Sequence, residues 1–333
     1  MWTLVGGDFS AEYGGITQQG KREMHARLTV LLPIHNGMPF LKEAVESILS
    51  QTYAEFRLLI IDDGSTDNSL EYVKSLSDPR IELVEQTAAK GLCRKLNYAI
   101  FHLIDSEFVA TLHQDDVALP TRLEEQLSFM IQNPKYCCVF SLVSKIGAGG
   151  REFGYYRSGG KGAVEDYELD RLGCLVQSSM LVRREKFVAV GGAREECFPA
   201  DDFDLLLRLW EIGPVAVINK PLIRYRIHAQ AETFDSFWTM QIKTRYVKEM
   251  HRRRKNGQSE IPFNEWLKSD TPSLVRRLLR YSKGAGQLLF RKAGGLIGEH
   301  QHLRGAMYLF GAFCCYPSFV GRRLLTLRRP KAN

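Results

Sequence analysis

The sequence predicts an α/β fold, in which a mostly parallel sheet is flanked by helices and followed by a basic helical C-terminal region. Three observations support this prediction. Between residues 28 and 116, unbroken apolar runs of strand length alternate with segments of helical period. Acidic clusters follow the ends of two of these runs. Residues 241–333 contain 20 Lys and Arg against 5 Asp and Glu, a net charge of +15 that leaves −8 for residues 1–240.

Four apolar runs in the N-terminal half predict buried parallel strands. Runs without polar alternation are typical of strands that helices cover on both faces. The predicted strands are 28–34, 56–61, 81–84 and 108–112, and the intervening helices are 41–49, one ending near residue 76, and 90–103. In such sheets the ligand-binding loops follow the carboxyl ends of the strands, which is where the acidic clusters fall.

The second half has a less regular pattern. A helix is expected from about Pro120, and glycines between residues 147 and 162 indicate turns. Strands are predicted at 177–182 and 215–218, with a helix at 201–210 between them. The predicted organisation is therefore an extension at 1–26, a domain at 27–235 with halves 27–117 and 118–235, and a basic helical region at 236–333.

The composition is that of a soluble globular protein. Hydrophobic residues make up 44% and charged residues 25%, which excludes a largely disordered or collagen-like chain. The seven cysteines form no CxxC pair and lack zinc-type spacing, so we expect reduced, mostly buried thiols. No charged start followed by an apolar run marks a secretory signal, and a cytoplasmic location is expected.

The longest uncharged stretch, residues 305–321, is the candidate membrane contact. It has 17 residues and is interrupted by Pro317, whereas a spanning helix needs about 20 apolar residues. Flanking arginines such as Arg304 and Arg323 favour a helix that lies on an anionic membrane surface. The alternative is a core helix with a solvated basic end.

Two acidic clusters carry the candidate chemistry. Asp115 and Asp116 are adjacent carboxylates after the fourth predicted strand, a suitable place for Mg²⁺ or Mn²⁺ bound through oxygen ligands. The same pair would also serve as a turn and N-cap before the next helix. The cluster at 62–67, Asp-Asp-Gly-Ser-Thr-Asp, is in isolation typical of a turn that caps a helix. Neither cluster alone specifies a function.

In combination, the motifs resemble those of the family 2 glycosyltransferases, which have the glycosyltransferase-A fold. The resemblance covers roughly residues 28–230. It rests, in chain order, on Pro33-Ile34-His35-Asn36, Gln51-Thr52, Ile60-Ile61 with the cluster at 62–67, Gly91-Leu92 with Asn97, Gln114-Asp115-Asp116, Gly191-Gly192, and Asp201-Asp202-Phe203-Asp204-Leu205.

The resemblance implies a site for a nucleotide-sugar. Asp63 would hydrogen-bond the nucleotide base, in a pocket lined by the backbone around Pro33 and His35, and Asp115 would lie near the ribose and diphosphate. The implied binding residues are Pro33, His35, Asn36, Asp63, Gly91, Arg94 and Asp115. Gln177-Ser178-Ser179 is a further candidate for contact with the sugar or the acceptor.

The resemblance also implies a divalent metal, Mn²⁺ or Mg²⁺. Asp116 would coordinate it, and His228 would complete the binding of the metal or the diphosphate. His113 stands where the family often has another Asp, a departure with little expected consequence for the metal.

The implied general base is Asp202, which would take the proton from the attacking hydroxyl of the acceptor. Asp201 is the second catalytic candidate, although the family more often has Glu at that position. Without the resemblance, acids at the start of a helix are explained by the helix dipole, worth about 0.3–1 kcal/mol.

We therefore expect an inverting, metal-dependent glycosyltransferase. It would move a sugar from a UDP- or dTDP-linked donor to a hydroxyl of a glycan or lipid-linked glycan precursor of a cell-surface polysaccharide, on the cytoplasmic face of the membrane. The alternative is a non-catalytic relative that binds a nucleotide-sugar or scaffolds a complex. A dinucleotide-binding dehydrogenase and a P-loop enzyme are disfavoured because neither glycine motif is present. Acidic strand ends disfavour a nucleic-acid partner.

Overall fold

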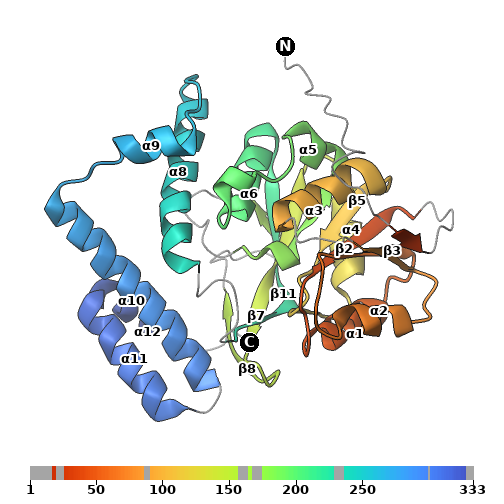
Figure 1. The fold of residues 1–333 in the computed structure, drawn as a ribbon, viewed down its shortest axis with the longest axis horizontal. Coiled ribbons are helices and arrows are strands. Elements are labelled where there is room, and N and C mark those ends of the chain that lie inside the picture. The colour runs from red at the N-terminus through yellow and green to blue at the C-terminus, as the bar shows by residue number, and fades with distance from the viewer. Residues whose placement is uncertain are drawn as a thin grey trace. The chain divides into compact units, whose positions relative to one another are not determined.

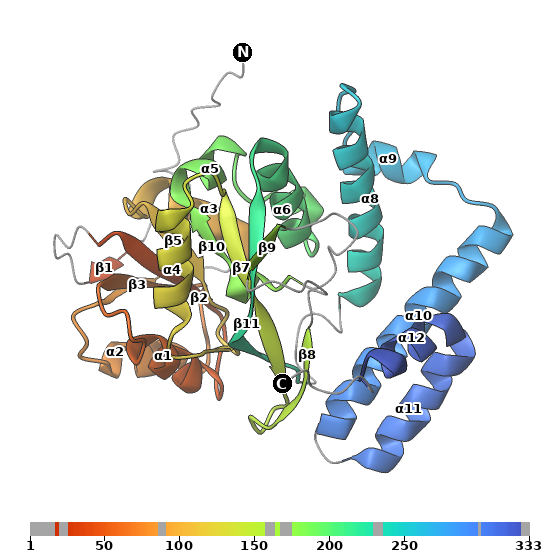
Figure 2. The same cartoon turned by 180° about the vertical axis from the view of Figure 1, so that it is seen from behind.

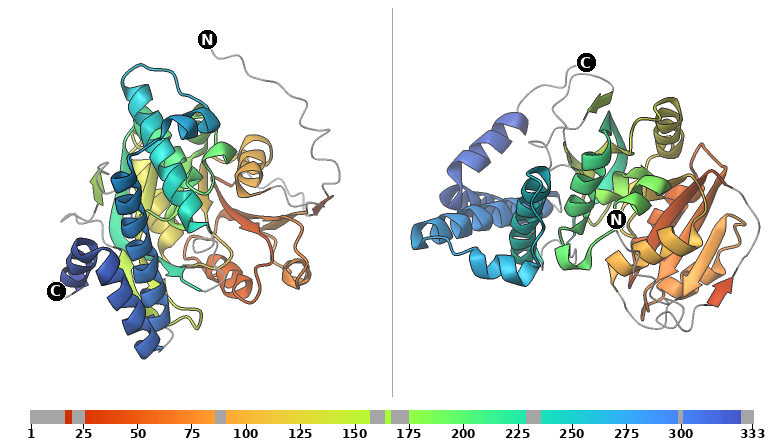
Figure 3. Two further views of the ribbon diagram at one scale, coloured as in Figure 1. Left: turned by 60° about the vertical axis from the view of Figure 1, so that its left-hand side comes forward. Right: turned by 90° about the horizontal axis from the view of Figure 1, so that it is seen from above.

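The computed structural model describes residues 17–19, 26–85, 91–156, 164–166, 175–228, 236–298 and 301–327, and Figures 1 to 3 show their course. The chain divides into two compact units. The first comprises Met1–Val143, Tyr156–Ala193 and Leu209–Tyr225, and the second comprises Ser144–Tyr155, Arg194–Arg208 and Arg226–Asn333. The domain boundaries expected from the sequence stay a prediction.

Four parallel strands form the centre of the first unit. They are β4 Ile81–Glu85, β3 Phe56–Asp62, β2 Leu28–Ile34 and β5 Phe108–Thr111, adjacent in that order. Every residue of β2 and β5 is buried, as the unbroken apolar runs predicted. All four strands lie within one residue of their predicted bounds.

Helices cover both faces of these strands. α1 Leu41–Leu49 and α2 Ser69–Ser75 lie on one face, and α3 Leu92–Tyr98 with the π-helix η1 Ala99–Leu103 lies on the other (Figures 1 and 2). The chain moves outward from β2 to β4 and then crosses back to β5. The strand order therefore reverses between β2 and β5, the position at which open α/β sheets bind ligands.

Antiparallel strands extend the sheet on both sides. β1 Thr17–Gln19, inside the segment expected to be an extension, pairs with β4. β10 Leu181–Arg183 pairs with β5 and with β7 Cys138–Ile146. β8 Glu152–Tyr156 pairs with β7, and its residues up to Tyr155 belong to the second unit, as does the end of β7. β11 Val215–Arg226 pairs with β6 Val117–Ala118 and β9 Val164–Asp166. The helices α4 Arg122–Gln132 and α5 Arg184–Ala189 complete the unit.

Two sequence-based expectations differ from this structure. The predicted strand at 177–182 is wrong for its first half, which is the 3₁₀ helix η3 Gln177–Ser179, and only its end joins β10. Gln177 and Ser178 form side-chain bonds that compete with strand pairing. The strand β7 was not expected, because Ser141, Ser144 and Lys145 interrupt its apolar pattern.

The second unit is mainly helical and confirms the predicted helical C-terminal region. It contains η4 Glu195–Cys197, the start of α6 Asp201–Ile212, and the helices α8 Phe237–Lys255, α9 Phe263–Ser269, α10 Leu274–Gly298, α11 His302–Cys315 and α12 Pro317–Leu327.

The uncharged stretch at 305–321 forms two helices and not one. α11 ends at Cys315, and Pro317 begins α12 because proline lacks the backbone N–H that a continuing helix would need. Across the described part of the chain, no helix combines the length and apolarity that crossing a bilayer requires.

Candidate active site

Three loops meet at the carboxyl ends of β2, β3 and β5. The parallel register pairs Ile34 with Asp62 and Leu31 with Thr111, so the three loops leave the sheet at the same end of the strands. Gln114 joins the first loop to the third: its amide oxygen accepts the His35 N–H at 2.7 Å, and its amide nitrogen donates to the His35 carbonyl at 3.0 Å. This two-point contact fixes the loops against each other.

Asn36 holds the loop after β3. Its backbone has a φ of 49°, a left-handed conformation that Asn tolerates better than most residues. Its side-chain oxygen accepts the N–H groups of Thr66 at 2.7 Å and Asp67 at 3.2 Å, and its own N–H donates to Ser65 Oγ at 3.0 Å. Asn36 therefore shapes the predicted base pocket through the loop.

The two acids that end β3 have different partners. Asp62, 2% exposed, accepts the N–H groups of Gly64 and Ser65, each at 3.1 Å, and so stabilises its own turn. Asp63 is 4% exposed and accepts the Gly91 N–H at 3.2 Å. The His35 ring nitrogen Nδ1 lies 3.0 Å from the Asp63 carbonyl oxygen. Three residues predicted to bind the nucleotide are thus brought together.

Lys95 is the partner of Asp63 that the sequence did not reveal. Its ammonium lies 3.2 Å from Asp63 Oδ2, and each side chain is 6% exposed. Arg94, the neighbouring residue that the sequence favoured, is exposed. The available signal was helical position, because Lys95 lies between Cys93 and Leu96 on the buried side of α3. Gly91, with a φ of 87°, begins this helix in a conformation that favours glycine.

We expect Lys95→Met to destabilise the protein by about 3–5 kcal/mol, because it removes the counter-charge from the buried Asp63 carboxylate. Urea unfolding followed by circular dichroism measures the change. The double variant Asp63→Asn with Lys95→Met should recover part of the loss, since neither member of the pair is then charged. Arg94→Met, an exposed cation one residue away, is the control and should change the stability little. A loss from Arg94→Met as large as that from Lys95→Met would contradict the assignment.

The loop after β5 brings together a donor set that fits a divalent metal. His113, Asp115 and Asp116 each offer one ligand atom, and these atoms all lie within 4.8 Å of one another. Two carboxylates and an imidazole suit Mn²⁺, whereas Mg²⁺ prefers oxygen ligands alone. Asp116 is fully buried, and His113 and Asp115 are partly buried. The sequence expected little consequence from His113, but the structure places its donor atom beside both carboxylates.

Residues of η3 hold this donor set in place. The His113 nitrogen Nε2 lies 3.0 Å from Gln177 Oε1, within hydrogen-bond distance, so Gln177 orients the imidazole ring. Ser178 accepts the His113 N–H at 3.1 Å and donates from its hydroxyl to Asp116 Oδ2. The sequence suggested that Gln177 and Ser178 contact the sugar or acceptor, and in the structure they contact His113 and Asp116.

Arg122 supplies a buried positive charge near Asp116. Its guanidinium is fully buried and donates to the carbonyls of Thr111 at 2.8 Å and Met180 at 3.3 Å. Burial lowers the pKa of Arg122, and attraction to the Asp116 carboxylate opposes that change. Gln126, one helical turn further, accepts from Arg122 Nε at 3.1 Å. The charge of Asp116 is thus partly balanced inside the protein.

The predicted general base lies in the second unit, at the start of α6. Asp202 is exposed, whereas its neighbour Asp201 is 4% exposed. Asp204 is fully buried in an ion pair with Arg208 at 2.6 Å, which gives this acid a structural task. An exposed carboxylate in the first turn of a helix is well placed to meet a ligand. Of the three acids in this turn, only Asp202 has an exposed side chain.

His228, the second predicted metal ligand, also belongs to the second unit. It follows the end of β11 and is partly buried. Its participation in metal binding stays a prediction, as do the roles of Asp201 and Asp202.

The sequence matches the family described as Glycosyl transferase family 2 over residues 29–191. Among curated proteins, it is 35% identical over 106 residues to the Escherichia coli protein named UDP-Glc:alpha-D-GlcNAc-diphosphoundecaprenol beta-1,3-glucosyltransferase WfgD, covering 32% of this chain and 42% of that protein. It is 35% identical over 114 residues to the putative glycosyltransferase EpsE of Bacillus subtilis, covering 33% and 40%. The chain thus spans about two fifths of the length of these relatives.

Solved structures of TarS from S. aureus have a similar fold. Residues 1–349 of TarS in complex with UDP-GlcNAc superpose with a TM-score of 0.55 at 14% identity, over 88% of this chain and 91% of that one. The complex with UDP gives a TM-score of 0.52 at 12% identity, over 85% and 89%. At this identity the likeness shows the fold alone, and it confirms the predicted glycosyltransferase-A type.

Proposed function

We propose that this chain is an inverting, metal-dependent glycosyltransferase with a nucleotide-sugar donor, and the match of residues 29–191 to glycosyl transferase family 2 supports the proposal. The observation that carries the proposal is that Asp63 and the His113–Asp115–Asp116 set follow the carboxyl ends of β3 and β5, the two parallel strands on either side of β2. A base-binding acid and a metal-binding set at the same end of the strands match the two ends of a nucleoside diphosphate.

The donor's nucleotide would bind at this end of the strands. Asp63, whose Oδ2 also contacts Lys95 and Gly91, would accept an N–H of the base. Pro33, His35 and Asn36 would shape the base pocket, and Asp115 would lie near the ribose. Arg94 is exposed at the start of α3 and would meet the diphosphate. The names of the relatives support a UDP-linked donor, because TarS was solved with UDP and with UDP-GlcNAc and WfgD is named for UDP-Glc. A dTDP-linked donor is the other option.

His113, Asp115 and Asp116 would hold the divalent ion, with His228 as a further ligand. Bound there, Mn²⁺ or Mg²⁺ would supply positive charge that favours departure of the nucleoside diphosphate. The chain's own contribution is to orient the ligands: Gln177 contacts the His113 ring, and the Ser178 hydroxyl donates to Asp116.

Transfer itself would use Asp202 as the general base. The acceptor hydroxyl attacks the anomeric carbon from the side opposite the diphosphate, and its proton passes to Asp202. The new bond joins the acceptor oxygen to the sugar, the bond from the sugar to the diphosphate breaks, and the configuration inverts. Asp201, buried beside the base, would support its position.

We further propose that the acceptor is a glycan or lipid-linked glycan precursor in cell-surface polysaccharide synthesis, reached at the cytoplasmic face of a membrane. The support is the name of WfgD, which specifies a diphosphoundecaprenol-linked sugar, and the net charge of +15 over residues 241–333.

A donor panel tests the function. We expect one UDP- or dTDP-linked sugar to raise the melting temperature of the protein by several degrees with Mn²⁺, and EDTA to abolish the shift, because a ligand that binds only the folded state stabilises it. Asp63→Asn should weaken the effect of every nucleotide tested. No shift with any donor would contradict the proposal. If a donor raises the melting temperature but is neither transferred nor slowly hydrolysed, the result would favour the alternative, a relative that binds the donor without turnover.

A further inference from the structure

The helix α11 exposes an apolar face to solvent. Leu303, Met307 and Phe310 recur at helical spacing on one side, and they are 80%, 67% and 71% exposed. On the opposite side, Gly305 and Ala312 are buried where α11 meets α10. A surface helix normally turns polar residues outward, so this helix has the pattern of one whose outer face is covered by something apolar.

The first two turns of α10 carry a second uncovered apolar side. Leu274, Val275 and Leu278 are 70%, 66% and 61% exposed, and Leu279 is 54% exposed. Val275 and Leu279 precede Gly286 by three and two helical turns, so they share the side on which Gly286 packs against Tyr316 and Ala312. α11 lies beside α10 (Figures 1 and 3). Because Ala312 of α11 meets α10 at Gly286 and the exposed apolar residues of α11 lie on its opposite side, the two patches face the same way.

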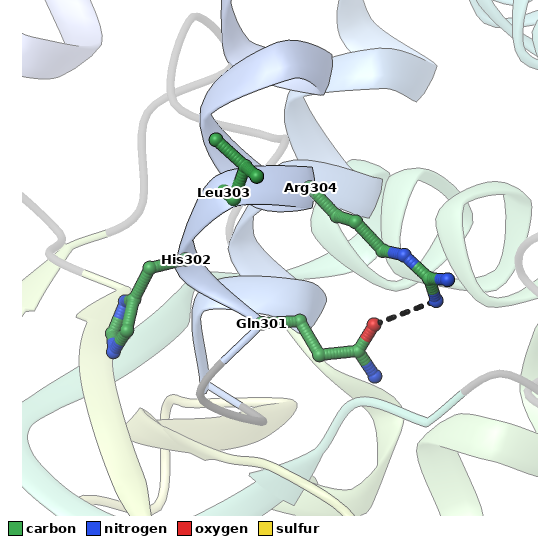
Figure 4. A pocket seen from close by; sticks show the side chains of 4 residues that line it. All are labelled: Gln301, His302, Leu303 and Arg304. Carbon is green, nitrogen blue, oxygen red and sulfur yellow. Dashed lines mark hydrogen bonds between the residues drawn. The ribbon is translucent and has the colours of Figure 1, made fainter.

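Basic residues surround both patches. Residues 271–333 contain 12 Lys and Arg and a single acidic residue, Glu299. Arg276 and Arg277 are exposed in the same two turns of α10 that carry its apolar patch. Figure 4 shows Arg304 at the start of α11, where its guanidinium donates to Gln301 at 3.2 Å. Two shallow hollows meet at this arginine, one bordered by Leu303 and the other by Met307.

We propose that these two patches, the outer face of α11 and the first two turns of α10, form one docking surface for an anionic lipid bilayer. The charge decides between occupants. A second copy would bring the same excess of positive charge to the contact and repel it, whereas a lipid surface supplies both an apolar layer and negative headgroups. The helix α11 would lie in the plane of the interface, with Leu303, Met307 and Phe310 among the acyl chains and Arg304 at the headgroup phosphates.

Through this surface the protein would reach the membrane-bound acceptor of the proposed function. The proposal rests on that function only in the identity of the acceptor. Binding to vesicles therefore tests it without any sugar. We expect the full chain to sediment with vesicles of phosphatidylcholine and phosphatidylglycerol, and Met307→Glu with Phe310→Glu to reduce the bound fraction about tenfold or more. Arg276→Gln with Arg277→Gln should weaken binding to these vesicles, because it removes two positive charges, but the apolar contribution to binding should remain.

Matched variants separate the causes. Gln132→Glu with Gln258→Glu adds the same charge at two exposed polar positions and should bind as the parent chain does. Met307→Ser with Phe310→Ser removes the apolar contact without adding charge and should also reduce binding. The Mn²⁺- and donor-dependent melting shift should be unchanged in all of them, which keeps a failed surface distinct from a failed function. Vesicle binding that is unchanged in both double variants, Met307→Glu with Phe310→Glu and Met307→Ser with Phe310→Ser, would overturn the proposal. So would a concentration-dependent dimer, seen by sedimentation velocity, that the same substitutions dissociate.

Discussion

Asp202→Asn is expected to lower kcat for sugar transfer by about 10²–10⁴-fold, the usual contribution of a positioned general base. The amide keeps the size and the exposed place of the carboxylate at the start of α6, but it cannot take the acceptor's proton. Because the base acts on the acceptor, the KM for the donor should change little, and Mn²⁺ binding should remain. Steady-state rates with a saturating donor measure the effect.

Glu196→Gln is the matched control, because it neutralises another exposed carboxylate shortly before α6. It should leave kcat within a few-fold of the parent value. Azide or formate, small bases that can occupy the space left in a truncated variant, should partly rescue Asp202→Gly but not Asp202→Asn. Full activity of correctly folded Asp202→Asn would remove this residue from the reaction and leave the rest of the proposed site untouched.

The central sheet was predictable because its information is local. Each of β2, β3, β4 and β5 is a short apolar run bounded by a turn, and burial on both faces removes the need for alternation. β7 follows a different rule. Its apolar residues are interrupted by serines, and it is recognisable only once β10 is known to pair with it.

The site was predictable at the acids and not at their partners. Asp63 and Asp116 stand in recognisable motifs at strand ends, whereas the side chains that hold them lie far along the chain. Ser178 and Asp116 are 62 residues apart, and His113 and Gln177 are 64 apart. Pairs at such separations leave no periodic signal in one sequence. Lys95 was missed for another reason, because a lysine in a helix is ordinarily assigned to the solvent side.

The helix start at 201–204 shows how equal residues acquire unequal roles. Asp202 and Asp204 are both acids in the first turn of α6, so sequence alone credits either with the helix dipole. Burial separates them: Asp204 is enclosed with Arg208, and Asp202 faces solvent. Loss of one partner from a buried ion pair leaves the other charge buried and unpaired, so Asp204→Asn should lower the stability of the protein. Asp202→Asn should instead lower the rate of transfer.

Asp116→Asn is expected to raise the Kd for Mn²⁺ by about 100-fold or more, since even the loss of a residue that only orients a ligand costs 10–100-fold. Two features make Asp116 the ligand with the largest effect. Its carboxylate is fully buried, and Ser178 and Arg122 hold it by a hydrogen bond and by charge. Removing the negative charge also leaves the buried Arg122 without its nearby counter-charge. Titration followed by the electron paramagnetic resonance of free Mn²⁺ measures the affinity directly, and transfer activity should fall in parallel.

The comparison with His113→Asp completes this prediction. His113 would offer a ring nitrogen to the ion, so bound Mn²⁺ in the parent chain should show a ¹⁴N coupling in electron spin echo measurements. His113→Asp should weaken that coupling, because it replaces one of the two proposed nitrogen ligands by oxygen and so moves the preference from Mn²⁺ toward Mg²⁺. Asp116→Asn should weaken the binding of Mn²⁺ and of Mg²⁺ to a similar extent. A ¹⁴N coupling of unchanged strength in His113→Asp would show that His113 does not bind the ion and that another histidine, with His228 as the first candidate, supplies the nitrogen.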